Sequence, residues 1–196
     1  MNRRLSFALL CALLLVIPGL SWAAKPASTQ PGTYTDWNDV DQVTIVQPFQ
    51  LAAFKSVSVQ PLDTSNATLP PPDDNSYADV KAALASSTQA FIQGMQQKLG
   101  TLPVQAGKGG GLIVRARITK SDPGSRAARY FVGFGAGAAK IGVAGEIVDG
   151  RTNKVLVRFV QERHSFAGGF GGGYRDLLDR TLRQIGGDVA GLLRAF

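Results

Sequence analysis

The feature that most constrains the fold of this chain is a pair of alternating segments on either side of a short turn sequence. In the first segment apolar residues alternate with small or polar ones, at Ile141, Val143, Gly145 and Ile147. Residues 149–153, Asp-Gly-Arg-Thr-Asn, have the glycine and polar side chains of a turn. The alternation then resumes at Val155, Val157 and Phe159. A period of two on both sides of a turn predicts two paired antiparallel strands, so the chain is expected to build a sheet around this hairpin.

Two further segments have the same period of two. Residues 54–59 alternate before Pro61, and this pattern predicts a strand. In residues 112–118 apolar positions alternate with Arg115 and Arg117. The apolar positions are Leu112, Val114, Ala116 and Ile118. This segment is therefore expected to be a strand with one face in the core and one face in water.

Two longer segments have helical periodicity. The segment from Tyr77 to Leu99 begins after a capping-box pattern, carries an apolar stripe and stops at Gly100. The C-terminal segment from Tyr174 to Phe196 also has one apolar face, formed by Leu178, Leu182, Ile185, Val189, Leu193 and Phe196. Each stripe is expected to cover the sheet.

These elements predict an α+β (mixed α/β) fold. It has a small, mostly antiparallel sheet covered by two amphipathic helices, in the order strand-helix-strand-strand-strand-helix. Gly186, Gly187 and Gly191 weaken the last helix, each by about 1 kcal/mol relative to alanine. Either another element packs closely against this helix or its end is loose. Gly187 and Gly191 also form a small-xxx-small pair that would admit a partner helix.

The N-terminus has the pattern of a secretory signal peptide. Arg3 and Arg4 precede an apolar stretch over residues 7–17, and Ser21-Trp22-Ala23 is a small-x-small cleavage site. The division expected is a signal peptide over residues 1–23, a flexible leader over 24–41 and a single domain over 42–196. The mature chain is then exported to the periplasm. The competing interpretation is an uncleaved anchor, but the apolar stretch is short for a membrane span.

Cleavage would remove the only cysteine, Cys11. Cys11 is not expected to carry a lipid, because the residues before it are leucines and not the small residues of a lipid-attachment site. Disulfides, thiolate zinc sites and cysteine nucleophiles are therefore excluded from the mature chain. The whole chain has 21 basic and 14 acidic residues, a net charge of +7, and removing Arg3 and Arg4 leaves about +5. These charges are dispersed, which disfavours nucleic-acid binding. A basic face toward anionic lipid or cell-wall polymer and an ordinary solvated surface both remain open.

No motif predicts a cofactor or a metal. The glycine-rich residues 133–138 lead into a strand, whereas a dinucleotide-binding loop should open a helix. The glycines of residues 107–111 lack the spacing and the Ser or Thr of a phosphate loop. The acidic residues 35–41 have Asp41 where a calcium loop needs glycine. His164 is the only histidine, and no nucleophile motif accompanies it.

The residues from Gly124 to Asp149 identify a family. The stretch Gly124-Ser125-Arg126, the pair Arg129-Tyr130, the segment Gly133 to Gly137, the strand to Asp149 and the following turn resemble the bacterial envelope domain-of-unknown-function family forty-four ten. The likeness extends from about Val43 to the C-terminus. The resemblance implies an exported bacterial protein, often a lipoprotein, with a small α/β domain and no assigned reaction. This chain departs from it in lacking a lipid-attachment cysteine.

The leading hypothesis is a non-enzymatic binding or adaptor protein of the periplasm and cell envelope. Its partner would be an envelope protein or an outer-membrane component, contacted through the glycine-rich loops. The candidate contact residues are Arg126, Arg129, Phe134, Phe166 and Phe170. The simpler interpretation, which is favoured, is that Arg126 and Arg129 pair with Asp122, Glu146 or Asp149, because arginines near strand ends commonly form internal pairs.

The alternative hypothesis is binding of a small ligand or lipid under the loop from Arg126 to Ala138, with peripheral membrane contact. A cell-wall hydrolase is the third. It would need two carboxylates at catalytic separation, taken from Glu146, Asp149 and Glu162. In a regular strand Glu146 and Asp149 point to opposite faces, which disfavours this enzyme.

Overall fold

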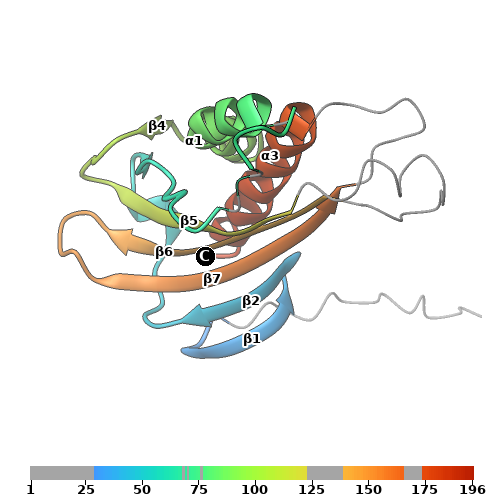
Figure 1. Ribbon diagram of the computed structural model, residues 1–196. Helices are drawn as coiled ribbons and strands as arrows, with labels where there is room; N and C mark the ends of the chain where they lie inside the picture. Colours follow the sequence, from blue (N-terminus) through green and yellow to red (C-terminus); the bar gives the residue numbers. More distant parts are fainter. Residues whose placement is uncertain (1–28, 68, 70, 76, 123–138, 166–173) are drawn as a thin grey trace, which may run out of the picture.

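The computed structural model describes the chain except for residues 1–28, 68, 70, 76, 123–138 and 166–173 (Figure 1). The predicted signal peptide therefore lies outside the described residues. The strands form one seven-stranded sheet in the order β1-β2-β7-β6-β5-β3-β4. Two helices, α1 and α3, lie together on one face of this sheet (Figure 1).

The hairpin predicted from the alternating pattern forms the centre of the sheet. Its strands are β6 (Ala139–Asp149) and β7 (Val155–Ser165), and Gly145 pairs with Phe159 in their antiparallel register. Strand β5 (Leu112–Asp122) pairs antiparallel with the other side of β6. Two short strands, β3 (Val57–Val59) and β4 (Val104–Ala106), extend the sheet in parallel beyond β5.

The opposite edge of the sheet differs from the expectation of a flexible leader over residues 24–41. Within that range Gly32–Trp37 is strand β1, and it forms a hairpin with β2 (Val40–Ile45), which pairs with β7. The two-residue turn, Asn38 and Asp39, has φ angles of 57° and 65°. Both values are those of a type I′ turn, which asparagine and aspartate tolerate and which suits the twist of paired strands. The polar composition that indicated a loop is thus that of a hairpin turn.

The helices begin and end close to the predicted residues. Helix α1 spans Tyr77–Leu99 and is followed by Gly100 at φ 63°, while α3 spans Tyr174–Leu193, three residues shorter than predicted. Leu178, Leu182 and Ile185 of α3 are fully buried against the sheet and α1. The fold class predicted from the sequence is confirmed, and α3 packs in its own domain.

The chain end joins the first hairpin to the core. The ring of Phe196 stacks on Phe49 at 4.4 Å between centroids and meets the edge of Trp37 at 5.6 Å. Trp37, Phe49 and Phe196 are all partly buried against the core. Trp37 thus fastens β1 to the end of the chain.

Candidate functional site on the open face of the sheet

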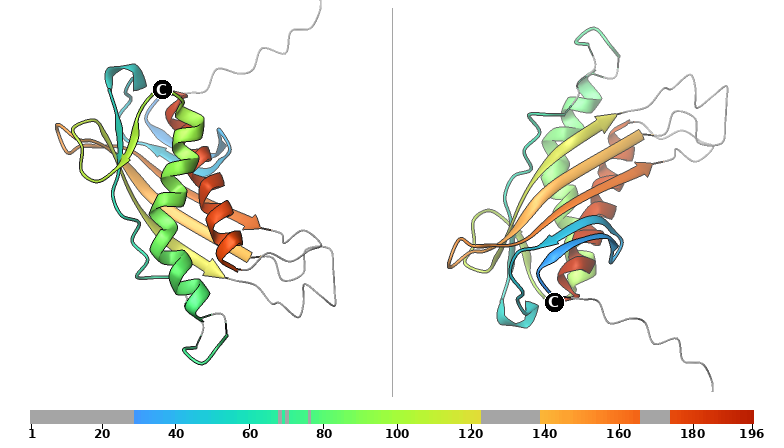
Figure 2. Two further views of the ribbon diagram at one scale, coloured as in Figure 1. Left: turned by 90° about the horizontal axis from the view of Figure 1, so that it is seen from above. Right: turned by 90° about the horizontal axis from the view of Figure 1, so that it is seen from below.

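The two helices cover only one face of the sheet. The view from below shows β5, β6 and β7 with no helix in front of them (Figure 2, right). Because side chains alternate along a strand, each residue adjacent to a core position points to this open face. Arg115 and Arg117 of β5 flank the core residue Ala116, and Arg158 of β7 lies between the buried Val157 and Phe159.

A hollow lies on this open face over the middle of the three strands. Its volume is about 500 Å³. It is lined by Asp63, Arg115, Ala116, Arg117, Ala144, Gly145, Glu146, Arg158, Phe159 and Val160. We call this site the arginine hollow. From the central strand β6 it is lined by the backbone of Gly145 and by Ala144, whose small side chain leaves space between Arg117 and Val160.

Gly145 is also needed on the opposite, core side of the sheet. A Cβ at this position would lie 2.7 Å from the Phe159 ring and 2.6 Å from the backbone oxygen of Arg115. The Phe159 ring is 2 % exposed and belongs to the core. The small residue in the middle of β6 is thus fixed by packing under the sheet.

The positive charges of the arginine hollow are only partly neutralised. Arg158 Nε lies 3.0 Å from Glu146 Oε1, which forms an ion pair. Arg115 instead donates to the neutral amide oxygen of Asn153 at 2.6 Å. Within the described residues, Arg115 has no ion pair, and the Arg117 side chain has neither an ion pair nor a hydrogen bond. Two guanidinium groups are therefore available to an acidic partner.

Asp63 at the rim belongs to a local turn. Its Oδ1 accepts the backbone N–H of Ser65 at 2.9 Å. This hydrogen bond, and next the Ser65 hydroxyl, hold the pKa of Asp63 below its ordinary value, while the charge of Arg117 contributes least. Asp63 is thus a weak partner for Arg117.

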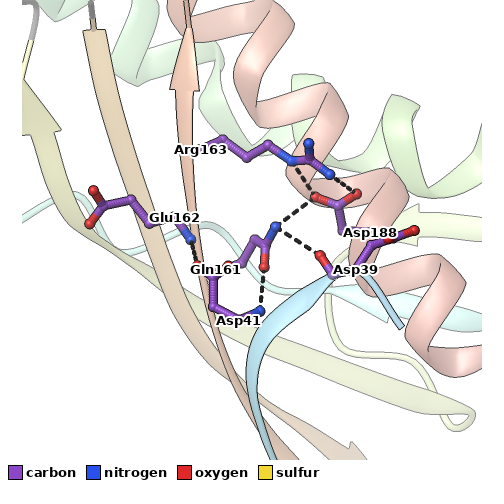
Figure 3. Close-up of polar contacts among 6 residues, drawn as sticks. All are labelled: Asp39, Asp41, Gln161, Glu162, Arg163 and Asp188. Carbon is purple, nitrogen blue, oxygen red and sulfur yellow. Dashed lines mark hydrogen bonds and ion pairs between the residues drawn. The ribbon is translucent and has the colours of Figure 1, made fainter. Parts of the chain in front are cut away.

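A second polar cluster fastens the first hairpin to β7 and α3 (Figure 3). Gln161, 2 % exposed, donates to the backbone oxygen of Asp39 at 3.1 Å and to Asp188 at 3.0 Å. It also accepts the N–H of Asp41 at 2.9 Å. Arg163 makes two hydrogen bonds to Asp188, of 2.8 and 2.6 Å. These bonds to Asp188 raise the pKa of Arg163, and the charges of Asp39 and Asp41 add to the effect. The polar groups of this cluster form hydrogen bonds with one another, as buried polar groups that stabilise a fold do. We therefore regard the cluster as structural.

The predicted contact residues are not placed by this structure. Arg126, Arg129 and Phe134 lie in residues 123–138, and Phe166 and Phe170 lie in 166–173, all outside the described residues. Their role stays a prediction, as does the ligand-binding loop from Arg126 to Ala138.

The candidate carboxylates of a hydrolase have separate surroundings. Glu146 pairs with Arg158, whereas Asp149 accepts the N–H of Arg151 at 2.9 Å in the turn between β6 and β7. The latter bond holds the pKa of Asp149 below its ordinary value. Glu162 lies 3.4 Å from Lys120 and 3.3 Å from Nε2 of His164, and His164 is exposed. These contacts are ordinary surface pairs.

The alternating pattern of the sequence predicts the open face of β5 but not the hollow. It places Arg115 and Arg117 on the solvent-facing side of a strand, and it does not distinguish Arg158. The signal for a site would have been the register that aligns Arg115, Glu146 and Arg158 across three strands. That register depends on the turn and on a bulge between Ile147 and Val148, which the alternating pattern does not fix.

A smaller hollow of about 320 Å³ lies between the helices, on their outer side. It is lined by Gly94, Gln97, Lys98, Arg180, Arg183, Gln184 and Gly187. Arg183 is paired with Asp179 at 2.8 Å. In the described part of the chain no helix is long and apolar enough to cross a membrane, and no group of three or more potential metal-binding side chains is found.

Several solved structures have a similar fold. The chain resembles the PelC dodecamer from Paraburkholderia phytofirmans with 15% identity and a TM-score of 0.50, over 79% of this chain and 97% of that one. The hypothetical protein CT253 from Chlamydia trachomatis has 11% identity, a TM-score of 0.46 and coverages of 72% and 99%. Protein XCC0632 from Xanthomonas campestris has 13% identity and a TM-score of 0.40, over 71% of this chain and 83% of that one. At these identities the likeness to PelC shows the fold alone.

No curated protein matches the chain. A family model does match it, over residues 56–169, more than half of the sequence. The matched range runs from the start of β3 past the end of β7 and includes every residue that lines the arginine hollow. The chain therefore belongs to the family described as Domain of unknown function (DUF4410).

Proposed function

We propose that this protein is an exported, non-enzymatic binding protein of the bacterial cell envelope that acts as an assembly of identical copies. The observation that carries the proposal is the open face of the sheet, where two guanidinium groups of the arginine hollow have no ion pair among the described residues. A concave, charged and open surface is suited to binding a partner. Export is supported by the signal-peptide pattern of residues 1–23.

The non-enzymatic part of the proposal is supported by the way the polar side chains are used. Glu146 is held by Arg158, and Asp149 is held by its own turn. The pKa of Asp149 is lowered by its turn, whereas a general acid needs a raised pKa. Catalysis by a carboxylate pair would need two such groups facing one reacting bond. The arrangement favours binding.

Assembly is supported by the likeness to PelC, whose crystallised form is a dodecamer. A fold whose helices cover one face of the sheet leaves the other face and two strand edges available for contacts between copies. We therefore expect the purified mature chain to be multimeric at micromolar concentration.

The predicted glycine-rich loops are compatible with this proposal as a second contact region. Asp122 pairs with Lys140, and Lys140 pairs with His164, so the last residues of β5, the first of β6 and the last of β7 lie at the same end of the sheet. The segments 123–138 and 166–173 are attached at this end. Arg126, Arg129, Phe134, Phe166 and Phe170 remain the candidate contacts there.

In-cell photocrosslinking tests the binding face. A photoreactive residue at Val160, 40% exposed in the arginine hollow, is expected to yield a discrete protein adduct in the envelope. The matched control is Ala85, exposed on α1 on the opposite face. Equal adducts at both positions, or none at Val160 while the protein is folded, would refute the proposed face. Lipid adducts alone would favour the alternative of a lipid-binding protein.

A further inference from the structure

We infer that the arginine hollow of one copy receives the acidic hairpin tip of the next copy. This inference rests on the proposed assembly and names the surfaces that form it. We define the acidic tip as Asp36, Asp39 and Asp41, which lie in or beside the turn between β1 and β2.

The acidic tip has more negative charge than the described residues around it neutralise. All three aspartates are exposed. Asp36 has no ion pair within the described residues, and Gln161 contacts Asp39 only at its backbone oxygen. Figure 3 shows the Asp39 carboxylate pointing away from the cluster, with no interaction drawn to it. The nearby Arg163 is engaged by Asp188 through two hydrogen bonds. The tip therefore presents surplus negative charge to the solvent.

The arginine hollow has the opposite surplus. Arg158 is balanced by Glu146, but among the described residues Arg115 contacts a neutral amide and Arg117 has only its weak charge interaction with Asp63. Arg115 and Arg117 are two residues apart on one strand, so their Cα atoms are about 7 Å apart. At the tip, Asp36 precedes the turn and Asp39 lies in it, while the Asp41 carboxylate accepts the N–H of Glu162 at 2.6 Å. The Asp36 and Asp39 carboxylates can therefore pair with the two guanidinium groups through charge-assisted hydrogen bonds, which are the strongest kind.

The two surfaces cannot meet within one molecule. The Asn38 side chain donates to the backbone oxygen of Gly191 at 3.0 Å, and Gln161 donates to both Asp39 and Asp188. These bonds hold the tip against α3, on the helix-covered side of the sheet. The arginine hollow lies on the other side, over β5, β6 and β7. Contact between them must therefore be intermolecular.

This geometry determines the kind of assembly. The contact joins two different surfaces, so each copy keeps a free tip and a free hollow after pairing with one neighbour. Such heterologous contacts repeat head to tail, and they close into a ring where the rotation between neighbours permits. A second copy is a better fit than an unrelated anion because the complementary charges lie on the same chain.

Charge exchange tests the inference directly. We would compare the mature wild-type chain, purified from the periplasm, with Arg115→Glu/Arg117→Glu and with Asp36→Lys/Asp39→Lys, using mass photometry. Each variant is expected to raise the dissociation constant of the assembly by about tenfold or more, because like charges then face each other. An equimolar mixture of the two variants restores opposite charges at every contact, and it is expected to assemble again.

The control is Arg180→Glu, which reverses a charge in the hollow between the helices and is expected to leave the assembly unchanged. Asp36→Asn/Asp39→Asn removes the charges with a residue that tolerates positive φ, so loss of assembly there cannot come from a misfolded turn. Circular dichroism would verify that every variant is folded.

The outcomes separate the two proposals. A wild-type chain that stays monomeric would refute the proposed assembly itself. A wild-type assembly that survives both charge reversals, or that does not weaken as salt is raised, would refute only the contact between tip and hollow. Wild-type monomers that bind anionic lipid vesicles through Arg115 and Arg117 would assign the hollow to the membrane.

Discussion

Two adjacent glycines of α3 have opposite environments. A Cβ at Gly186 would overlap the backbone oxygen of Phe91 in α1, whereas at Gly187 the nearest atom is a backbone oxygen 3.8 Å away. Gly186→Ala is therefore expected to lower the free energy of unfolding by about 1–3 kcal/mol, since the helices must move apart. Gly187→Ala is expected to raise it by up to about 1 kcal/mol, the gain in helix propensity. Urea denaturation of the two variants measures both effects.

Gly94 provides an independent check, because a Cβ there would overlap the backbone oxygen of Arg183 in α3. Gly94→Ala should therefore be destabilising like Gly186→Ala. Equal effects at Gly186 and Gly187 would contradict this account of helix packing. The sequence analysis recognised that these glycines weaken α3 and singled out Gly187 and Gly191, but the close approach is at Gly186. Adjacent glycines look alike in a sequence, and only the partner helix distinguishes them.

At the scale of elements, the β1–β2 hairpin depends on one buried side chain. Gln161 accepts from Asp41 and donates to Asp39 and Asp188. Gln161→Leu would keep most of the side-chain volume but leave the Asp41 N–H and the Asp39 carbonyl unpaired. We expect a loss of about 1–3 kcal/mol and, in hydrogen exchange, lower protection of β1 and β2 than of β5 and β6.

The matched control for the hairpin is Lys120→Gln, which removes an exposed ion pair of 3.4 Å with Glu162. Surface pairs of this kind contribute under about 1 kcal/mol, so the control should leave the exchange of β1 and β2 unchanged. Protection lost evenly over the whole sheet in Gln161→Leu would show that the hairpin does not open separately.

The elements that sequence analysis predicted are those with a long, regular pattern. Helix α1 and the β6–β7 hairpin have several repeats of their period, which is why their bounds could be predicted. Strand β4 is only three residues long, and β1 has mostly exposed residues, so neither has a hydrophobic repeat. The position of β4 depends on its backbone pairing with β3. The position of β1 depends on its pairing with β2 and on the contact of Trp37 with Phe196. Sequence periodicity does not report such contacts.

At the scale of the whole molecule, the candidate site combines residues from three strands and the loop before α1. The wet face of β5 was predictable from the alternation of Arg115 and Arg117. The concavity was not, because it depends on Ala144 of β6 lying between the larger Arg117 of β5 and Val160 of β7. The opposed charges of tip and hollow likewise appear only when the hairpin is placed on the helix-covered side. The net charge of the whole chain is a sum over all residues, so it does not show that negative charge gathers at the tip and positive charge at the hollow.

Stability in acid is a property of the whole molecule to which two turns contribute measurably. The Asp63 and Asp149 carboxylates each accept a backbone N–H at 2.9 Å, and these bonds hold the pKa of both groups below the ordinary value of 3.8. The unfolded chain takes up these protons at the ordinary pKa, whereas the folded chain takes them up only at lower pH. Between the two values the unfolded state binds more protons, so stability falls as the pH falls through this window.

We therefore expect the urea midpoint of the wild-type chain to fall between about pH 5 and pH 2. Asp63→Asn/Asp149→Asn keeps a side-chain acceptor at each turn but removes the two titrations, so its midpoint should fall less over the same range. Growing positive charge at low pH destabilises both proteins, and the difference between their slopes isolates the two carboxylates. Parallel slopes would mean that the two turns hold these carboxylates no more strongly in the folded chain than in the unfolded one. The acid sensitivity would then come from the general rise in positive charge and from the other carboxylates.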